Sequence, residues 1–238
     1  GAGCTHNDIV DAEFDGRVAR TASRPIPSGQ VSKRQAFAFA VMLCLIGLAV
    51  LLQFNWTTVI LGASSLLLVA VYPFAKRYTN WPQLVLGLTF KWGALVGWTS
   101  ITGQLSWPMI VLYAGCIAWT IAYDTIYAHQ DKEDDAMIGL KSTALHFGEA
   151  TPRYLTLFYG LAVVLWVWAG WLAGAQIGFF AAVALSVVHF GWQIATLDMA
   201  DPANCLKRFK SNMQVGWLLT LGLIADLMLM AAASGGFR

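Results

Sequence analysis

The stretch WPMIVLYAGCIAWTIAYDTIY at residues 107–127 is long and apolar, and Asp124, near its end, is its only charged residue. A helix over these residues is long enough to cross a hydrocarbon core of about 30 Å. Further stretches share this character, namely Ala36–Phe54, Thr57–Phe74, Pro82–Ile101, Leu155–Ala175, Ile177–Thr196 and Val215–Ala233. They lack the short alternating segments of a membrane barrel. The sequence therefore predicts an all-α, polytopic transmembrane helical bundle with about seven complete spans.

Composition supports this prediction. Hydrophobic residues make up 58% of the 238 residues and charged residues only 12%. A soluble domain carries roughly a quarter charged residues. We therefore expect a lipid bilayer around the chain and no nucleic-acid partner.

The distribution of Lys and Arg predicts the orientation of the spans. With Gly1–Gln35 in the cytoplasm, the loops at 75–81, 128–154 and 197–214 fall on the same side. These segments hold Arg17, Arg20, Arg24, Lys33, Arg34, Lys76, Arg77, Lys132, Lys141, Arg153, Lys207, Arg208 and Lys210. The loops predicted on the opposite side hold none, although the terminal Arg238 falls there. Because positive residues mark the cytoplasmic face, this orientation is favoured.

Two acidic clusters fall on that predicted cytoplasmic face. One consists of Asn7, Asp11 and Asp15, and the other of Asp124, Asp131 and Asp135. Spacings of four and seven residues predict one helical face for each cluster. Crowded carboxylates near a bilayer need a positive partner, and a hard divalent cation prefers oxygen ligands. The clusters therefore predict a Mg²⁺ site that binds a diphosphate, against the simpler interpretation of a solvated, mixed-charge loop.

Basic and polar residues accompany both clusters. Two prolines make residues 23–29 a turn rather than a helix, and this turn brings Arg24 close to the carboxylates. Tyr127 lies one turn after Asp124, and Lys141 supplies a donor suited to phosphate. Lys76 and Arg77 are interpreted either as membrane anchors or as a clamp, whereas Lys207, Arg208 and Lys210 are interpreted as anchors.

Lys91 and Asp226 lie near the centres of predicted spans. A charge at the bilayer centre costs roughly 2.5–3.5 kcal/mol on insertion scales, so we expect these two residues to contact each other.

The residues Asn7-Asp8-Ile9-Val10-Asp11-Ala12-Glu13-Phe14-Asp15 resemble the first signature, NDxxDxxxD, of the UbiA superfamily of intramembrane prenyltransferases. Residues 123–135, YDTIYAHQDKEDD, resemble the second signature. The flanking segments at 20–29, 72–77 and 139–143 resemble the 4-hydroxybenzoate polyprenyltransferase branch.

The resemblance implies a fold of nine membrane helices. It thus implies that residues 1–238 form one domain that lacks the first helix and most of the second. It also implies transfer of a polyprenyl group from polyprenyl diphosphate to 4-hydroxybenzoate, in ubiquinone synthesis. The implied location is a bacterial inner membrane or the mitochondrial inner membrane, with the active site on the cytoplasmic or matrix face.

The resemblance also assigns residues to roles. The implied catalytic residues are Asp11, Asp15, Asp124, Asp131 and Asp135. The implied Mg²⁺ ligands are Asn7, Asp11, Asp15, Asp124, Asp131 and Asp135. The implied substrate-binding residues are Arg20, Arg24, Lys76, Arg77, Tyr127 and Lys141.

Other functions stay open at this point. The acceptor can instead be a naphthoate, a haem, a chlorophyllide or a glycerol phosphate. An ion-coupled transporter is disfavoured, because its ionisable groups usually lie near the membrane midplane. A non-catalytic assembly partner is a third alternative.

Overall fold

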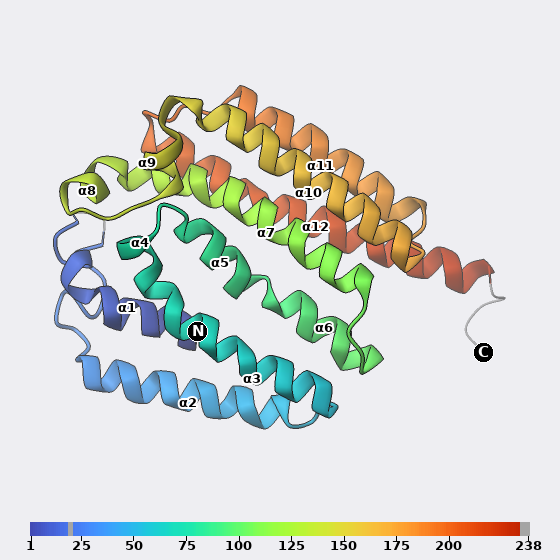
Figure 1. Ribbon diagram of the computed structural model, residues 1–238, viewed down its shortest axis with the longest axis horizontal. Helices are drawn as coiled ribbons and strands as arrows, with labels where there is room; N and C mark the ends of the chain where they lie inside the picture. Colours follow the sequence, from blue (N-terminus) through green and yellow to red (C-terminus); the bar gives the residue numbers. More distant parts are fainter. Residues whose placement is uncertain (19–20, 234–238) are drawn as a thin grey trace. The chain divides into compact units, whose positions relative to one another are not determined.

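The computed structural model describes residues 1–18 and 21–233. The chain divides into two compact units (Figure 1). Unit 1 contains Gly1–Gln104 and Glu133–Lys141, and unit 2 contains Leu105–Lys132 and Ser142–Arg238. That the two units form a single domain stays a prediction.

Unit 1 is helical throughout its regular structure. Its elements are α1 (Ala2–Asp15), α2 (Lys33–Leu51), α3 (Trp56–Val71), η1 (Tyr72–Phe74), α4 (Ala75–Tyr78), α5 (Pro82–Phe90), α6 (Trp92–Thr102) and most of α8 (Lys132–Met137). In this unit α1 packs chiefly against α2, and α3 packs against α6.

Side-chain caps define where the helices of unit 1 begin. The Ser32 hydroxyl accepts a hydrogen bond from the Gln35 backbone N–H, and the Gln35 side chain accepts one from the Ser32 backbone, so α2 starts with a capping box. Asn55 Oδ1 caps α3 by accepting from the Thr58 N–H at 3.0 Å. The Asn55 amide also donates to the Thr99 carbonyl at 2.8 Å, which ties α3 to α6.

The predicted span over Pro82–Ile101 is interrupted at its centre. Lys91 has φ −87° and ψ −2° and lies between α5 and α6. The two helices follow one another along the chain with a bend between them (Figure 1). The span is therefore built from two short helices rather than one.

Unit 2 contains the longer helices. Its elements are α7 (Trp107–Ala128), η2 (His129–Asp131), α9 (Thr143–Phe147), η3 (Gly148–Ala150), α10 (Thr151–Ala173), α11 (Ile177–Ala195) and α12 (Pro202–Ala233). The most extensive contact lies between α7 and α10, followed by that between α11 and α12.

Glycines allow both of these helix pairs to approach closely. Trp166 of α10 is fully buried against Gly115 of α7, where an added Cβ would lie 2.7 Å from the indole ring. An added Cβ on Gly222 of α12 would lie 2.6 Å from the carbonyl oxygen of Gly178 in α11. In lipid there is no hydrophobic driving force for helix association, so helices associate through close packing, and small residues let their backbones approach.

Asp226 joins the same pair of helices by hydrogen bonds. Gln176, the N-cap of α11, makes no side-chain cap. The buried Asp226 carboxylate instead accepts from the N–H groups of Gln176 at 2.8 Å, Gly178 at 2.7 Å and Phe179 at 3.3 Å. These backbone donors satisfy the carboxylate within unit 2. That Lys91, which belongs to unit 1, contacts Asp226 stays a prediction. A helix N-terminus stabilises a negative charge through its free N–H groups and its dipole.

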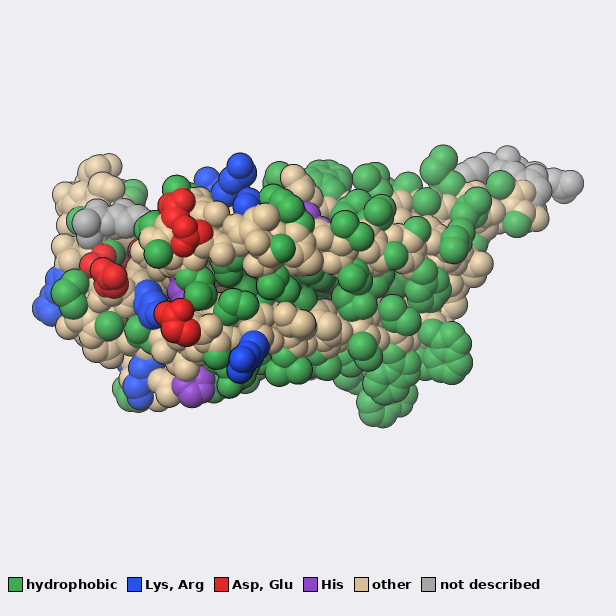
Figure 2. All heavy atoms as spheres, turned by 90° about the horizontal axis from the view of Figure 1, so that it is seen from above, with side chains coloured by type: hydrophobic (Ala, Val, Ile, Leu, Met, Phe, Trp, Pro, Cys, Tyr) green, Lys and Arg blue, Asp and Glu red, His purple; other side chains and the backbone are tan. Residues whose placement is uncertain are grey.

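The described residues contain seven helical segments long and apolar enough to cross a membrane, which confirms the predicted architecture. Their bounds are Lys33–Leu51, Trp56–Tyr78, Pro82–Thr102, Trp107–Met137, Thr143–Ala173, Ile177–Ala195 and Pro202–Ala233. Figure 2 shows hydrophobic side chains spread along the helices and exposed on their surface. The chain is an integral membrane protein.

One basic residue differs from its predicted role as a surface anchor. Arg208 of α12 is only 8% exposed, and its guanidinium lies 4.2 Å from the centre of the Trp192 ring. It donates to the Thr196 carbonyl at 3.2 Å, just after α11 ends. The anchor prediction was wrong for Arg208, because a cation that caps a helix C-terminus is stabilised there by the free carbonyls.

Candidate active site

The first acidic motif lies on α1, as its spacing predicts. Asp11 and Asp15, one turn apart, are both buried, whereas Glu13 between them is exposed. Asn7 lies one turn before Asp11 and is half-buried. The motif thus presents its carboxylates along one buried face of a regular helix.

Asp11 is paired with two cations that follow α3. Its side chain has 0% exposure, and its Oδ2 lies 2.7 Å from Lys76 Nζ while its Oδ1 lies 3.3 Å from Arg77 Nη2. The Lys76 contact is an ion pair by distance, but Asp11 Oδ2 accepts no aligned hydrogen bond. Because a buried carboxylate is costly without a countercharge, Lys76 and Arg77 account for its burial.

Arg24 gives Asp15 its countercharge. Its Nη1 donates to Asp15 Oδ2 at 2.7 Å and to Asp8 Oδ1 at 3.2 Å. The segment 21–30 consists of turns rather than regular helix and carries Gly29 at φ 77°, which agrees with the predicted turn. The turn is tied to α1 by the Thr21 hydroxyl, which donates to the Asp15 carbonyl at 2.8 Å. Of the predicted basic residues near this motif, Arg20 lies outside the described residues.

Asp8 is a member of this cluster that the motif spacing did not place on the ligand face. Desolvation by burial raises the pKa of its carboxyl, Arg24 lowers it, and Asp15 and Asp11 raise it again. The net direction is upward from the ordinary value. The signal that could have found Asp8 is its position beside Asn7 in the motif, within reach of the same guanidinium.

Lys141 approaches the same region through its backbone. Its N–H donates to the Lys76 carbonyl at 2.8 Å, and its ammonium donates to the Tyr78 carbonyl at 3.3 Å. Gly139, at φ 73°, makes the turn that leads into this contact. Lys141 therefore lies beside Lys76 within unit 1.

The second acidic motif runs over three consecutive helical elements, and that its carboxylates share one face stays a prediction. Asp124 lies near the end of α7, Asp131 ends the 3₁₀ turn η2, and Asp135 lies on α8. A 3₁₀ turn has three residues per turn instead of 3.6, so it rotates the face that follows. Asp124 and Asp131 belong to unit 2, and Asp135 belongs to unit 1. That both motifs meet over a shared pair of metal ions stays a prediction.

Aromatic residues surround the second motif within unit 2. The ring of Tyr127 lies 4.5 Å from that of Phe209, and the ring of Tyr123 lies 5.7 Å from it. Phe209 was not among the predicted residues, because the run at 207–210 was interpreted only as a membrane anchor. A groove of 630 Å³ opens beside these rings, lined by Trp119, Tyr123, Phe209, Lys210, Asn212, Met213, Gly216, Trp217 and Thr220.

The chemistry of the predicted ligands fits a hard divalent cation. Every one of them offers an oxygen atom, as Mg²⁺ prefers, and the buried Asp11 Oδ2 has no hydrogen-bond partner. Among the residues that the structure describes, however, no three His, Cys, Asp or Glu side chains already converge as a metal cluster. In unit 1 the countercharges of the carboxylates are Arg24, Lys76 and Arg77.

Comparisons with curated proteins find relatives over nearly the whole chain. It is 47% identical over 232 residues to the mitochondrial 4-hydroxybenzoate polyprenyltransferase of Drosophila pseudoobscura pseudoobscura, covering 97% of this chain and 58% of that protein. It is 48% identical over 226 residues to the enzyme of the same name from Rattus norvegicus, covering 94% and 60%. The chain thus spans about three fifths of the length of these relatives.

Solved structures give the same fold. An apo structure of a UbiA homolog from Aeropyrum pernix K1 matches with a TM-score of 0.81 and 26% identity, over 95% of this chain and 84% of that one. A UbiA homolog from Archaeoglobus fulgidus bound to GPP and Mg²⁺ matches with a TM-score of 0.71 and 18% identity, over 93% and 81%. The model of the UbiA prenyltransferase family matches residues 1–233. The chain belongs to the UbiA prenyltransferase family.

Proposed function

We propose that this chain transfers a polyprenyl group from polyprenyl diphosphate to the ring carbon ortho to the hydroxyl of 4-hydroxybenzoate, with Mg²⁺ as cofactor. The observation that carries the proposal is the buried Asp11 of the first motif, flanked by Lys76 and Arg77. A carboxylate held beside two cations provides both a ligand for a metal and groups that bind a diphosphate. The names of the relatives supply the acceptor.

We assign Asn7, Asp11 and Asp15 to one Mg²⁺, and Asp124, Asp131 and Asp135 to the other. When bound, Mg²⁺ neutralises the diphosphate and makes it a better leaving group. The oxygen-only donor set supports this assignment. The UbiA homolog from A. fulgidus was solved with GPP and Mg²⁺ bound, which supports Mg²⁺ as the cofactor.

The basic residues are proposed to bind the diphosphate. Lys76 and Arg77 are positioned by their contacts with Asp11, and the Arg77 Nε is buried with no partner of its own. We also assign Arg20, Arg24 and Lys141 to this group. Charge-assisted hydrogen bonds to phosphate oxygens are about twice as strong as neutral ones.

The acceptor and the prenyl chain are assigned to more apolar surroundings. We assign Tyr127 to substrate binding, and an aspartate of the second motif (Asp124, Asp131 or Asp135) to accepting the proton of the phenol. The ring carbon ortho to the hydroxyl then bonds to the prenyl group as the bond between the prenyl carbon and the diphosphate oxygen breaks, and a base removes the ring proton. Apolar helices exclude water, which protects a cationic prenyl group from hydrolysis. The long prenyl tail is proposed to leave sideways into lipid, so that its length is not limited by a closed cavity.

The membrane is proposed to be a mitochondrial or bacterial inner membrane. The names of the relatives, which include the word mitochondrial, favour mitochondria. The active site is assigned to the face rich in Lys and Arg, cytoplasmic or matrix. The pathway implied by the substrate is ubiquinone synthesis.

A membrane assay tests this function. Membranes containing the chain, geranyl diphosphate and Mg²⁺ receive 4-hydroxybenzoate, a naphthoate or a glycerol phosphate in parallel, and products are identified by mass. We expect a ring-prenylated 4-hydroxybenzoate, lost in Asp11→Asn but kept in Glu13→Gln, which changes an exposed carboxylate of the same helix. Prenylation of another acceptor alone overturns the substrate assignment, and no product with any acceptor overturns the activity.

A further inference from the structure

The two cations that pair with Asp11 are held in different ways. Arg77 Nη2 donates to both the Val10 carbonyl at 3.1 Å and Asp11 Oδ1 at 3.3 Å. Its guanidinium also lies 4.9 Å from the centre of the Phe14 ring and 5.2 Å from that of Phe74. A planar guanidinium group that makes several directed contacts is held in one position. Arg77 therefore holds α1 against the segment that follows α3.

Lys76 has a much looser hold on the same carboxylate. Its ammonium lies 2.7 Å from Asp11 Oδ2, yet that oxygen accepts no aligned hydrogen bond. Its ammonium is carried on a flexible stem, while its backbone carbonyl accepts a hydrogen bond from the Lys141 N–H at 2.8 Å. The Lys76 ammonium can therefore leave Asp11 without any rearrangement of the backbone.

Asp11 cannot remain buried as an uncompensated charge. Its side chain has 0% exposure, and without Lys76 the Oδ2 atom would lose its countercharge, while Arg77 stays at 3.3 Å from Oδ1. A divalent cation bound by Asp11 Oδ2 would replace the Lys76 ammonium as the partner of that oxygen. Metal and ammonium thus compete for one oxygen.

We propose that Lys76 is the resident counterion of Asp11, and that its displacement makes the first motif bind a divalent cation weakly alone and tightly together with a diphosphate. The diphosphate gives the displaced ammonium a new partner, so each ligand favours the binding of the other. This inference rests on the proposed function, because it takes Asp11 as a metal ligand. It adds a statement about which species is bound: the first motif prefers the metal–diphosphate complex to the metal alone.

Metal binding without any prenyl acceptor tests the inference. Purified protein in detergent is titrated with Mn²⁺, and free Mn²⁺ is followed by electron paramagnetic resonance, with and without inorganic diphosphate. Corrected for Mn²⁺–diphosphate complexes in solution, the wild-type protein is expected to bind Mn²⁺ roughly tenfold more tightly when diphosphate is present. Lys76→Met is expected to bind Mn²⁺ alone roughly tenfold more tightly than wild type, with a correspondingly smaller effect of diphosphate.

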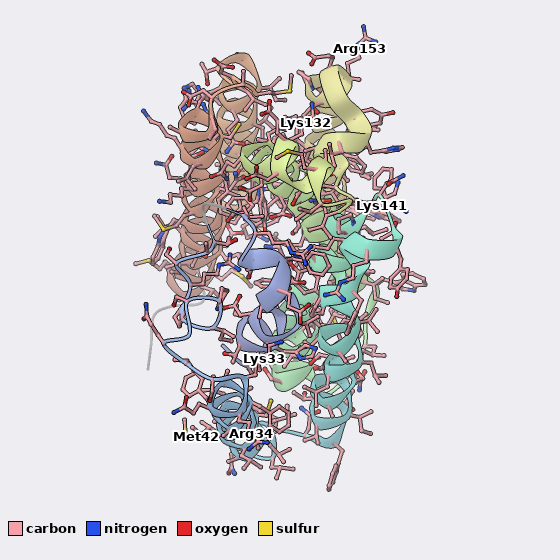
Figure 3. The ribbon with its side chains drawn as sticks, turned by 90° about the vertical axis from the view of Figure 1, so that its left-hand side faces the viewer. Lys33, Arg34, Met42, Lys132, Lys141 and Arg153 are labelled. Carbon is pink, nitrogen blue, oxygen red and sulfur yellow. The ribbon has the colours of Figure 1, made fainter. Side chains whose placement is uncertain are left out.

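Matched variants separate the possible outcomes. Lys76→Arg keeps the charge and is expected to bind Mn²⁺ alone no more tightly than wild type. Lys33→Met, which removes an exposed lysine at the start of α2 (Figure 3), is expected to bind Mn²⁺ like wild type. Unchanged or weaker Mn²⁺ affinity in folded Lys76→Met, with binding lost in Asp11→Asn, overturns the counterion proposal and leaves the proposed function intact. Unchanged binding in Asp11→Asn overturns the metal assignment itself. If Lys76→Met does not fold, the wild-type titration still decides, because an absence of coupling to diphosphate contradicts the proposal.

Discussion

The Asp226 carboxylate of α12 accepts a hydrogen bond from the Gly178 N–H of α11 at 2.7 Å. Together with the bonds from Gln176 and Phe179, it caps a helix whose own N-cap residue makes no cap. We expect Asp226→Ala to lower the free energy of unfolding by about 2 kcal/mol, because three N–H groups at the start of α11 lose their acceptor. Thermal unfolding in detergent measures the loss, and Asp198→Asn, at an exposed loop, is expected to change little. Equal effects of the two substitutions contradict the capping role.

Arg24 links the turn after α1 to the first motif. We expect Arg24→Ala to lower kcat/KM for prenyl transfer by about tenfold or more, because the Asp15 side chain loses its partner at 2.7 Å. Limited proteolysis should also cut the segment 21–30 faster in this variant. Arg17→Ala, which changes an exposed arginine nearby, serves as the control and should keep both properties. Wild-type activity with an intact turn in Arg24→Ala argues against this role.

Divalent metal is expected to be required for turnover. EDTA should stop prenylation and added Mg²⁺ should restore it, because the proposed ligands offer only oxygen donors. Asp131→Ala should abolish turnover while circular dichroism shows unchanged helical content. Residual activity of Asp131→Ala near the wild-type level rules out this residue as an essential ligand.

Gly139 makes the turn that leads Lys141 to the Lys76 carbonyl. Its φ of 73° is a conformation that costs an L-residue about 1–2 kcal/mol, so Gly139→Ala should weaken this contact and raise KM for the diphosphate substrate. Gly160→Ala is the matched control, since it adds a methyl group in open space on α10. We expect that control to keep wild-type kinetics and to be as stable as wild type or slightly more so. Identical KM values for the two variants contradict a role for the turn.

Much of the fold could be predicted from the sequence. Apolar stretches such as residues 107–127 are long enough to span a bilayer, and in lipid every backbone polar group must be satisfied within a helix. The predicted α-helical spans were therefore confirmed within the described residues. The α1 face that carries Asp11 and Asp15 was also predictable, because residues four positions apart lie on the same face of an α-helix.

Partners across the fold could not be predicted in the same way. The 3₁₀ turn at His129–Asp131 was not predicted, since hydropathy does not distinguish 3₁₀ from α-helical hydrogen bonding. The hydrogen bonds that Asp226 accepts from backbone N–H groups were not predicted either. The free N–H groups of a helix N-terminus carry no charged side chain that a sequence could show.

The sequence by itself determined that the chain spans a membrane, and that carboxylates and basic residues in a prenyltransferase-like pattern gather in a few segments. Only the tertiary structure decided that Asp11 is fully buried and paired with Lys76 and Arg77, over sixty residues away. Local periodicity fixes which face of a helix a side chain occupies. Which distant charge it contacts depends on how the helices pack. A buried charge is costly until an opposite charge or an N–H group contacts it, and the packing decides which group does so.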